Sequence, residues 1–201
     1  VPNTDADWFR SNGLKLDERG YVTVDGYGRT NLDGVWALGD ITPGHALAHR
    51  AFEQGITIAE KIAGADPKPV IDDTVPQVVF SFPEAASVGL TLDQAKARED
   101  VVEPKETAYP MLSNARMLMS GEGGSMTVVS GAFANNPDMQ VVLGVHIVSP
   151  IASDLIAEAE QLVGNRVPLA DAARLIHPHP TFSETLGEAL LKADGRPLHT
   201  R

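Results

Sequence analysis

Two prolines about a third of the way along the chain constrain the fold more than any other feature. The run Asp66-Pro67-Lys68-Pro69 cannot continue a helix, because proline lacks the amide donor and fixes its own φ angle. The 201 residues are 43% hydrophobic, which is enough apolar material for one sizeable domain and part of another. We therefore predict a domain boundary between residues 69 and 70.

The residues before this boundary predict an α/β segment. Residues 20–25 alternate like a strand, and the apolar run 35–38 is typical of a strand covered on both faces. From 47 to 63 the apolar residues recur at helical spacing, and Gly64 is suited to ending that helix.

Beyond the boundary the pattern predicts an α+β domain with a mainly antiparallel sheet. Thr91-Leu92-Asp93-Gln94 has the form of a capping box that starts a short helix. Ser149-Pro150 combines a capping hydroxyl with a first-turn proline, which favours a helix that runs to Gly164. The other expected elements are strands at 77–82, 126–129 and 140–148, the last two paired as a hairpin, and helices at 169–176 and 183–193.

Composition excludes several classes of partner. The formal net charge is -11 and no Lys/Arg-rich run occurs, so nucleic acid or an anionic membrane would bind against the overall field. There is no cysteine, which excludes disulfides and Cys-ligated metals. No apolar run approaches the roughly 20 residues that span a bilayer. We expect a protein of the cytoplasm with no nucleic-acid or membrane partner.

The segment from His177 to Glu184, His-Pro-His-Pro-Thr-Phe-Ser-Glu, is the strongest candidate for chemistry. Prolines on both sides of His179 hold its imidazole in a fixed turn immediately before a helix. Glu184 lies in the first turn of that helix, within reach of one imidazole nitrogen. A carboxylate bonded to Nδ1–H fixes the tautomer and leaves Nε2 to exchange protons. The spacing is that of a catalytic acid/base dyad.

Two other interpretations of this segment remain open on spacing alone. Ser183 or Thr181 could cap the helix while Glu184 favours its positive end, which is the commoner local arrangement. His177 and His179 could begin a metal site, but no third ligand lies nearby at a typical spacing, so we predict no metal.

The first segment holds a candidate ligand-binding edge. Asp40 follows an apolar run and could bond a ribose or ribityl hydroxyl, although such an Asp is more often a turn residue. The helix that begins near Leu47 directs free amides into the same region, as every helix does at its start.

Several separated motifs together resemble the pyridine nucleotide-disulfide oxidoreductases. Thr30-x4-Val35-Trp36-Ala37-Leu38-Gly39-Asp40, followed by Leu47-Ala48-His49-Arg50-Ala51, is similar to the second flavin-binding motif of that family. Pro83-Glu84-x2-Ser87-Val88-Gly89, Asn114-Ala115-Arg116 and Leu143-Gly144-Val145-His146 resemble its interface domain. The segment from His177 to Glu184 resembles the form in the family's dihydrolipoamide dehydrogenases rather than in its glutathione, mercuric or mycothione reductases. Because these motifs occur in the family's order, they favour the dyad over the helix cap.

The resemblance implies two cofactors, FAD bound by the full-length enzyme and NAD as the electron acceptor. Asp40 would hold the flavin's ribityl chain, and the backbone at Ala46, Leu47 and Ala48 would face the flavin ring. His49 would support that turn. Pro180, beside the catalytic histidine, is also expected at the cofactor.

The resemblance also implies a reaction and partners. The protein would be a homodimer joined through its C-terminal domain, with the histidine motif of one subunit completing the active site of the other. His179 would take a proton from the thiol of a dihydrolipoamide carried by an acyltransferase or carrier protein, and Glu184 would orient and charge the imidazole.

The family's redox cysteine pair and Gly-x-Gly-x-x-Gly loops do not occur in these 201 residues. Residues 1–12 resemble the end of an NAD-binding domain, 13–69 the last segment of an FAD-binding domain, and 70–201 an interface domain. We therefore expect a processed or truncated product that is inactive by itself. The alternatives are a related reductase for another disulfide or a metal ion, and a stand-alone dimerisation module without chemistry.

Overall fold

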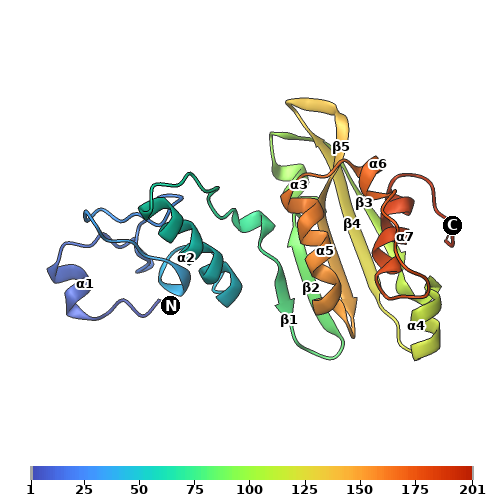
Figure 1. Cartoon of the computed structure of the whole chain (residues 1–201), viewed down its shortest axis with the longest axis horizontal. Helices are drawn as coiled ribbons and strands as arrows, with labels where there is room; N and C mark the ends of the chain where they lie inside the picture. Colours follow the sequence, from blue (N-terminus) through green and yellow to red (C-terminus); the bar gives the residue numbers. More distant parts are fainter. Residues whose placement is uncertain (1, 201) are drawn as a thin grey trace. The chain divides into compact units, whose positions relative to one another are not determined.

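The computed structural model describes residues 2–200 and divides the chain into two compact units, Val1–Asp72 and Asp73–Arg201 (Figure 1). Val1 and Arg201, the outer ends of the predicted segments 1–12 and 70–201, lie outside the described residues. The division follows shortly after the two prolines.

The first unit is built mostly of turns around one long helix. Its helices are α1 (Asp7–Ser11) and α2 (Ala48–Ile62), with the 3-10 turn η1 (Gly39–Ile41) between them; a second 3-10 turn, η2 (Asp72–Thr74), spans the division between the units. The predicted helix over 47–63 is confirmed, and Gly64 follows it with a φ of 86°, a conformation that suits glycine. A small apolar cluster of Phe9, Leu14, Val22 and Ala37 forms the core.

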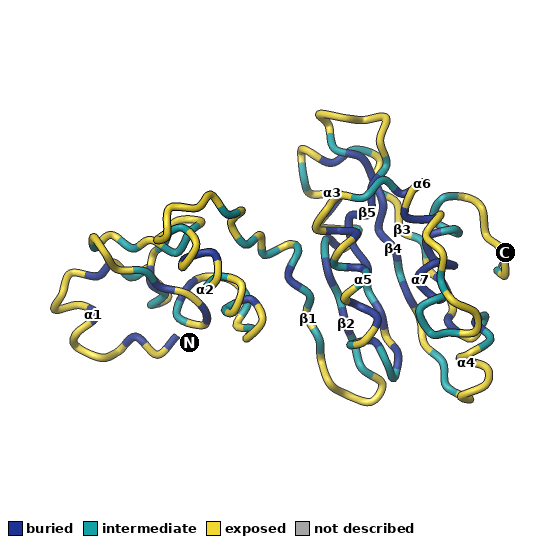
Figure 2. Tube along the Cα trace, in the orientation of Figure 1, coloured by how far each residue is buried: buried dark blue, intermediate teal, exposed yellow. Residues whose placement is uncertain are grey.

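The two strands predicted in this unit were wrong. Residues 20–25 contribute one isolated bridge, between Leu16 and Val22, and residues 35–38 one more, between Arg29 and Trp36. Val35 and Leu38 are 40% and 37% exposed, so the run is not covered on both faces. Much of the trace of the first unit is exposed, whereas the middle strands of the sheet in the second unit are largely buried (Figure 2). A strand needs partners along its length, and here pairing stops after one bridge, which is closed by the Ala37 amide donating to the Gly28 carbonyl at 2.9 Å and the Thr30 amide donating to the Val35 carbonyl at 3.1 Å.

The second unit contains a five-stranded antiparallel sheet, which confirms the predicted α+β class. The predicted hairpin is confirmed and is longer than expected, because Phe133 pairs with Asn136 across a two-residue turn. The predicted strand at 77–82 ends at Val79. The strands, arranged in the order β1-β2-β5-β4-β3, are β1 (Gln77–Val79), β2 (Glu84–Gly89), β3 (Val101–Pro110), β4 (Ser125–Phe133) and β5 (Asn136–Ser149).

Helices cover one face of this sheet. Helix α5 (Ala152–Gly164) packs on β2 and β5, and α7 (Glu184–Ala193) packs on β3 and β4 (Figure 1). Both bury apolar residues in one core with the inward side chains of the sheet, such as Val88, Val128 and Val145. The remaining elements are α3 (Leu92–Ala97), η3 (Met111–Ser113), α4 (Ala115–Ser120) and α6 (Leu169–Ala172). Among the described residues, no helix has both the length and the hydropathy that spanning a bilayer requires.

The ends of the helices test the capping predictions. The capping box is confirmed: the Gln94 amide donates to Thr91 Oγ1 at 3.3 Å, and the Thr91 amide donates to Gln94 Oε1 at 2.9 Å. The start predicted at Ser149-Pro150 was wrong, since Ser149 is buried at the end of β5 and α5 begins at Ala152. The carboxylate of Glu84 accepts from the Ser153 amide at 2.8 Å and so supplies the missing cap.

The helix predicted over 169–176 is shorter than expected. It ends at Ala172, and Ile176, which is 96% exposed, has no core to pack against. The chain then turns towards Pro178, and a residue that precedes proline disfavours helical backbone.

Candidate functional site

The structure brings His179 and Glu184 together at the start of α7. His179 Nδ1 lies 2.9 Å from Glu184 Oε1, and the second carboxylate oxygen accepts the Thr181 amide at 2.8 Å. The side chain of His179 is 69% exposed, whereas that of Glu184 is 19% exposed. With Glu184 ionised, Nδ1 donates to it, and Nε2 is left on a largely exposed ring. This is the arrangement of a base whose tautomer is fixed by a carboxylate.

The surroundings of Glu184 favour its ionised form. Partial burial opposes ionisation, but the Thr181 amide and the adjacent His179 outweigh it, so the pKa of Glu184 is lowered from its usual 4.5. An ionised carboxylate at this position accepts the Nδ1–H of His179, so that Nε2 is the nitrogen with a free lone pair.

Asn114 ties the turn that carries His179 to another part of the second unit. Its Nδ2 donates to the Thr181 carbonyl at 3.1 Å, and its Oδ1 caps α4 by accepting the amides of Arg116 and Met117. Asn114 is 4% exposed. Sequence reasoning assigned no role to this residue. An Asn immediately before a helix is a signal for a cap, but not for a contact 67 residues away.

The helix-cap interpretation matches the structure for Glu184, which lies in the first turn of α7, but not for the two hydroxyls. Ser183 precedes α7 but makes no capping hydrogen bond, and the hydroxyl of Thr181 donates to the Pro178 carbonyl at 2.6 Å. His177 Nε2 contacts Glu158 Oε1 on α5 at 2.8 Å. Across residues 2–200, no group of three or more His, Cys, Asp or Glu side chains is placed to hold a metal ion.

The cofactor positions predicted in the first unit surround the start of α2. Asp40 is exposed in turn η1, and Ala46 and Ala48 are exposed on either side of Leu47. Leu47 is the N-cap of α2 and has no side-chain capping bond, and the first turn holds no acidic residue. Leu47 thus offers no side-chain acceptor to the first amides of α2, and the positive end of the helix suits an electron-rich ring edge. His49 lies exposed in this first turn, and Pro180, the remaining predicted position, lies beside His179 in the second unit.

An ion pair supports the loop that precedes α2. Arg50 is 5% exposed, its Nε contacts Asp72 Oδ1 at 2.6 Å, and its Nη2 donates to the Pro43 carbonyl at 2.7 Å. A Cβ at Gly44, whose φ is 116°, would meet this guanidinium. Arg50 belonged to the motif quoted above, but sequence reasoning did not predict this role.

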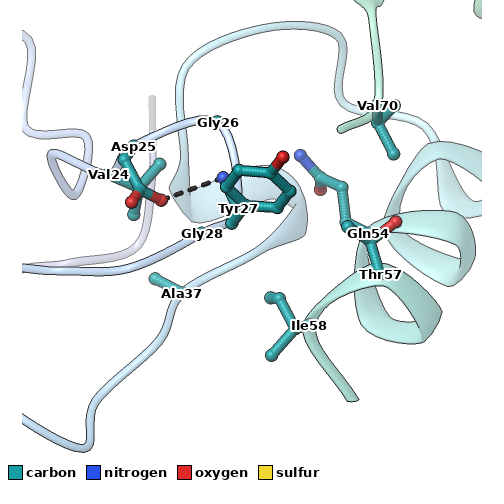
Figure 3. Close-up of a pocket in the computed structure, with 10 residues that line it drawn as sticks. All are labelled: Val24, Asp25, Gly26, Tyr27, Gly28, Ala37, Gln54, Thr57, Ile58 and Val70. Carbon is teal, nitrogen blue, oxygen red and sulfur yellow. Dashed lines mark hydrogen bonds between the residues drawn. The ribbon is translucent and has the colours of Figure 1, made fainter. Parts of the chain in front are cut away.

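A hollow beside α2 is too small for a cofactor (Figure 3). Its volume is about 30 Å³, which holds roughly one water molecule. Figure 3 shows Tyr27, Gln54 and Ile58 around it, with the Tyr27 amide donating to Asp25 Oδ1 at 2.9 Å. It is a packing gap rather than the position expected for a flavin.

Two family models match the sequence. Residues 75–190 match the model described as pyridine nucleotide-disulphide oxidoreductase, dimerisation domain, and residues 1–55 match the one described as pyridine nucleotide-disulphide oxidoreductase.

Individual proteins are similar over nearly the whole chain. A dihydrolipoyl dehydrogenase of Cupriavidus necator is 41% identical over an alignment of 201 positions, which covers 99% of this chain and 40% of that protein. One from Geobacillus stearothermophilus is 39% identical over 98% of this chain and 41% of its own length. The crystal structure of LpdA from Mycobacterium tuberculosis superposes with a TM-score of 0.84 at 31% identity, covering 96% of this chain and 41% of that one. The chain thus spans about 40% of the length of the relatives it matches.

Proposed function

The chain belongs to the pyridine nucleotide-disulphide oxidoreductase family, and we propose that it is the C-terminal part of a dihydrolipoyl dehydrogenase. The observation that carries the proposal is the contact of 2.9 Å between His179 Nδ1 and Glu184 Oε1, which leaves Nε2 on an exposed ring. The identity of about 40% to dihydrolipoyl dehydrogenases over nearly the whole chain supports the same conclusion.

In this proposal the dyad prepares a thiol for disulfide exchange. His179 Nε2 takes the proton from a thiol of dihydrolipoamide, and Glu184 stabilises the imidazolium that results. The thiolate then attacks one sulfur of a cysteine disulfide; a new S–S bond forms, the cysteine bond breaks, and a cysteine thiolate leaves. The second lipoyl thiol completes the exchange, so that dihydrolipoamide is oxidised and the cysteine pair is reduced. The 201 residues contain no cysteine, so the pair would come from a part of the protein outside this sequence.

Residues around the start of α2 fit one edge of an FAD site. Asp40 would bond a hydroxyl of the ribityl chain, and the backbone from Ala46 to Ala48 would face the flavin ring, with His49 supporting the turn. When bound, FAD accepts two electrons from the cysteine pair and passes them to NAD. The chain's own contribution is the positive end of α2, which favours added negative charge on the ring. Pro180 would lie at the cofactor beside His179.

We further propose a homodimer formed through residues 70–201, with His179 acting in the active site of the other subunit. The match to a dimerisation domain supports the pairing, and the 69% exposure of the His179 side chain suits a group that meets another chain. Residues 1–12 and 13–69 would complete the NAD-binding and FAD-binding domains. The lipoyl group would arrive on an acyltransferase or carrier protein, in the cytoplasm.

An assay of the whole protein that contains this chain tests the proposal. We expect a yellow dimer that reduces NAD with dihydrolipoamide and turns over poorly with glutathione disulfide, mycothione or mercuric ion. Efficient turnover of one of those substrates instead would contradict the dehydrogenase and indicate a related reductase. A stable dimer without flavin or activity would indicate a dimerisation module.

A further inference from the structure

The imidazole of His177 is seated between two helices of the second unit. Its side chain is 9% exposed, and its Nε2 lies 2.8 Å from Glu158 Oε1 on α5. On the other side lies Gly187 of α7, where an added Cβ would come 2.6 Å from Nδ1 and 2.9 Å from Cε1 of the ring. The slot is therefore open only because residue 187 has no side chain.

The two residues that meet in this slot are both close in sequence to the dyad. Glu184 and Gly187 are on the same face of α7, one turn apart, so His177 packs on the helix that carries the dyad's carboxylate. His177 itself is two residues before His179. After His179, the Thr181 carbonyl is held by Asn114. The turn is thus anchored on both sides of a histidine that is too exposed to be held by its own packing.

We propose that His177 is a positioning residue, whose ring between Glu158 and Gly187 fixes the place of His179 relative to Glu184. Two features of the contact make it a firm anchor. The ring is almost fully buried. Glu158 also raises the pKa of His177 against the opposing effect of burial, and a protonated His177 makes a charged, and therefore stronger, hydrogen bond to this carboxylate.

The chain offers a matched control on the same helix. His199 Nδ1 lies 2.8 Å from Glu188 Oε1, and the Glu188 side chain is 10% exposed. The substitution His199→Gln removes a histidine–carboxylate contact to α7 without touching the turn from 177 to 181. The His199→Gln variant therefore shows how much of any change comes from losing a histidine–carboxylate contact to α7, rather than from losing the position of the dyad.

The first measurement is the tautomer of His179 in the 201-residue chain, from nitrogen NMR shifts assigned with His179→Gln. With Glu184 holding Nδ1–H, we expect that tautomer to dominate in the unmodified chain and in His199→Gln. In His177→Gln we expect Nε2–H, the form that a solvated neutral histidine side chain favours, to become the larger population. Glu158→Ala should give the same change from a half-buried position, so the result does not depend only on tolerance of a substitution at the buried His177. Retention of Nδ1–H in both variants, or an equal change in His199→Gln, would overturn the proposal.

The second measurement is steady-state kinetics of the whole protein, and only this part rests on the proposed function. A displaced base lowers the chemical step more than binding, so His177→Gln should lower kcat about tenfold with KM changed less than about twofold. His199→Gln should change kcat less than about twofold. Unchanged kcat in His177→Gln would contradict the proposal. If the unmodified protein does not oxidise dihydrolipoamide, the proposed function fails, and the tautomer still decides the role of His177.

Discussion

Single residues decide what the second unit can do, because three histidine–carboxylate contacts surround α7 and differ in their environment. His177 meets Glu158 with a side chain that is 9% exposed, while His179 and His199 meet Glu184 and Glu188 with rings that are 69% and 62% exposed. Contact chemistry alone does not separate them. His179 combines an exposed ring with flanking prolines, which suits a proton-transfer group, whereas the buried ring of His177 suits an anchor.

The contact of His177 predicts how stability depends on pH. Glu158 raises the pKa of His177 above its usual 6.5, although burial acts in the opposite direction. The folded state therefore binds this proton more tightly than the unfolded state, and the contribution is complete below about pH 6.5 and is lost as pH rises through the raised pKa. Urea unfolding between about pH 5.5 and 9 should show this fall in the unmodified chain, and His177→Gln should flatten it. An unchanged slope in the variant would contradict the assignment.

The hydroxyl of Tyr109 gives a second prediction at this scale. Tyr109 is fully buried, its Oη has no hydrogen-bond partner among the described residues, and burial with the charges of Glu188 and Glu184 raises its pKa to about 12. A buried hydroxyl without a partner is costly, so Tyr109→Phe should leave the free energy of unfolding unchanged or raise it by up to about 1 kcal/mol. Chemical denaturation measures this, with the half-buried Tyr27→Phe as control. A loss above about 1 kcal/mol would show that the hydroxyl has a partner.

At the scale of elements, local patterns were predictable, whereas of the strand pairings only the hairpin of β4 and β5 was. Helices α2, α5 and α7 follow from apolar spacing within one segment. Strand β3 was not predicted, because Glu-Pro-Lys-Glu interrupts it; as an edge strand of the sheet it tolerates that proline. Strand β2 reads Glu-Ala-Ala-Ser-Val-Gly, a sequence with weak strand preference.

In the candidate site, too, the local contact could be predicted from the sequence and the long-range contacts could not. The spacing of five residues between His179 and Glu184 is local and could be read from the sequence. The contact between His177 and Glu158 depends on how α5 packs against the turn, and the contact between Asn114 and Thr181 joins segments 67 residues apart. Neither leaves a pattern in a single sequence.

Asn114 links two elements, since its side chain both caps α4 and donates to the Thr181 carbonyl in the turn before α7. Asn114→Ala removes these bonds from a buried position and should lower the free energy of unfolding by about 1–3 kcal/mol. The control is Asn165→Ala at the exposed end of α5, where one bond to the Gln161 carbonyl is lost and the change should stay below about 0.5 kcal/mol. Equal effects in the two variants would mean that the tether through Asn114 adds nothing.

At the scale of the whole molecule, the two units differ in how their backbone is protected. Residues 35–38 form no strand and include exposed apolar side chains, whereas β5 has a paired strand on each side. Hydrogen exchange followed by mass spectrometry should therefore show rapid exchange over 35–38 and slow exchange over 140–148. Similar protection in both stretches would contradict this account of the first unit.

The proposed function requires more protein than these 201 residues, because the relatives are longer and the chain has no cysteine. The most direct test of the dyad therefore uses the whole protein, with His179→Gln compared with His199→Gln. We predict that kcat for dihydrolipoamide oxidation falls about 10²–10⁴-fold in His179→Gln while the flavin absorbance is retained, and that His199→Gln stays near the unmodified rate. Turnover of His179→Gln at the rate of the unmodified protein would contradict the assignment of His179 as the base.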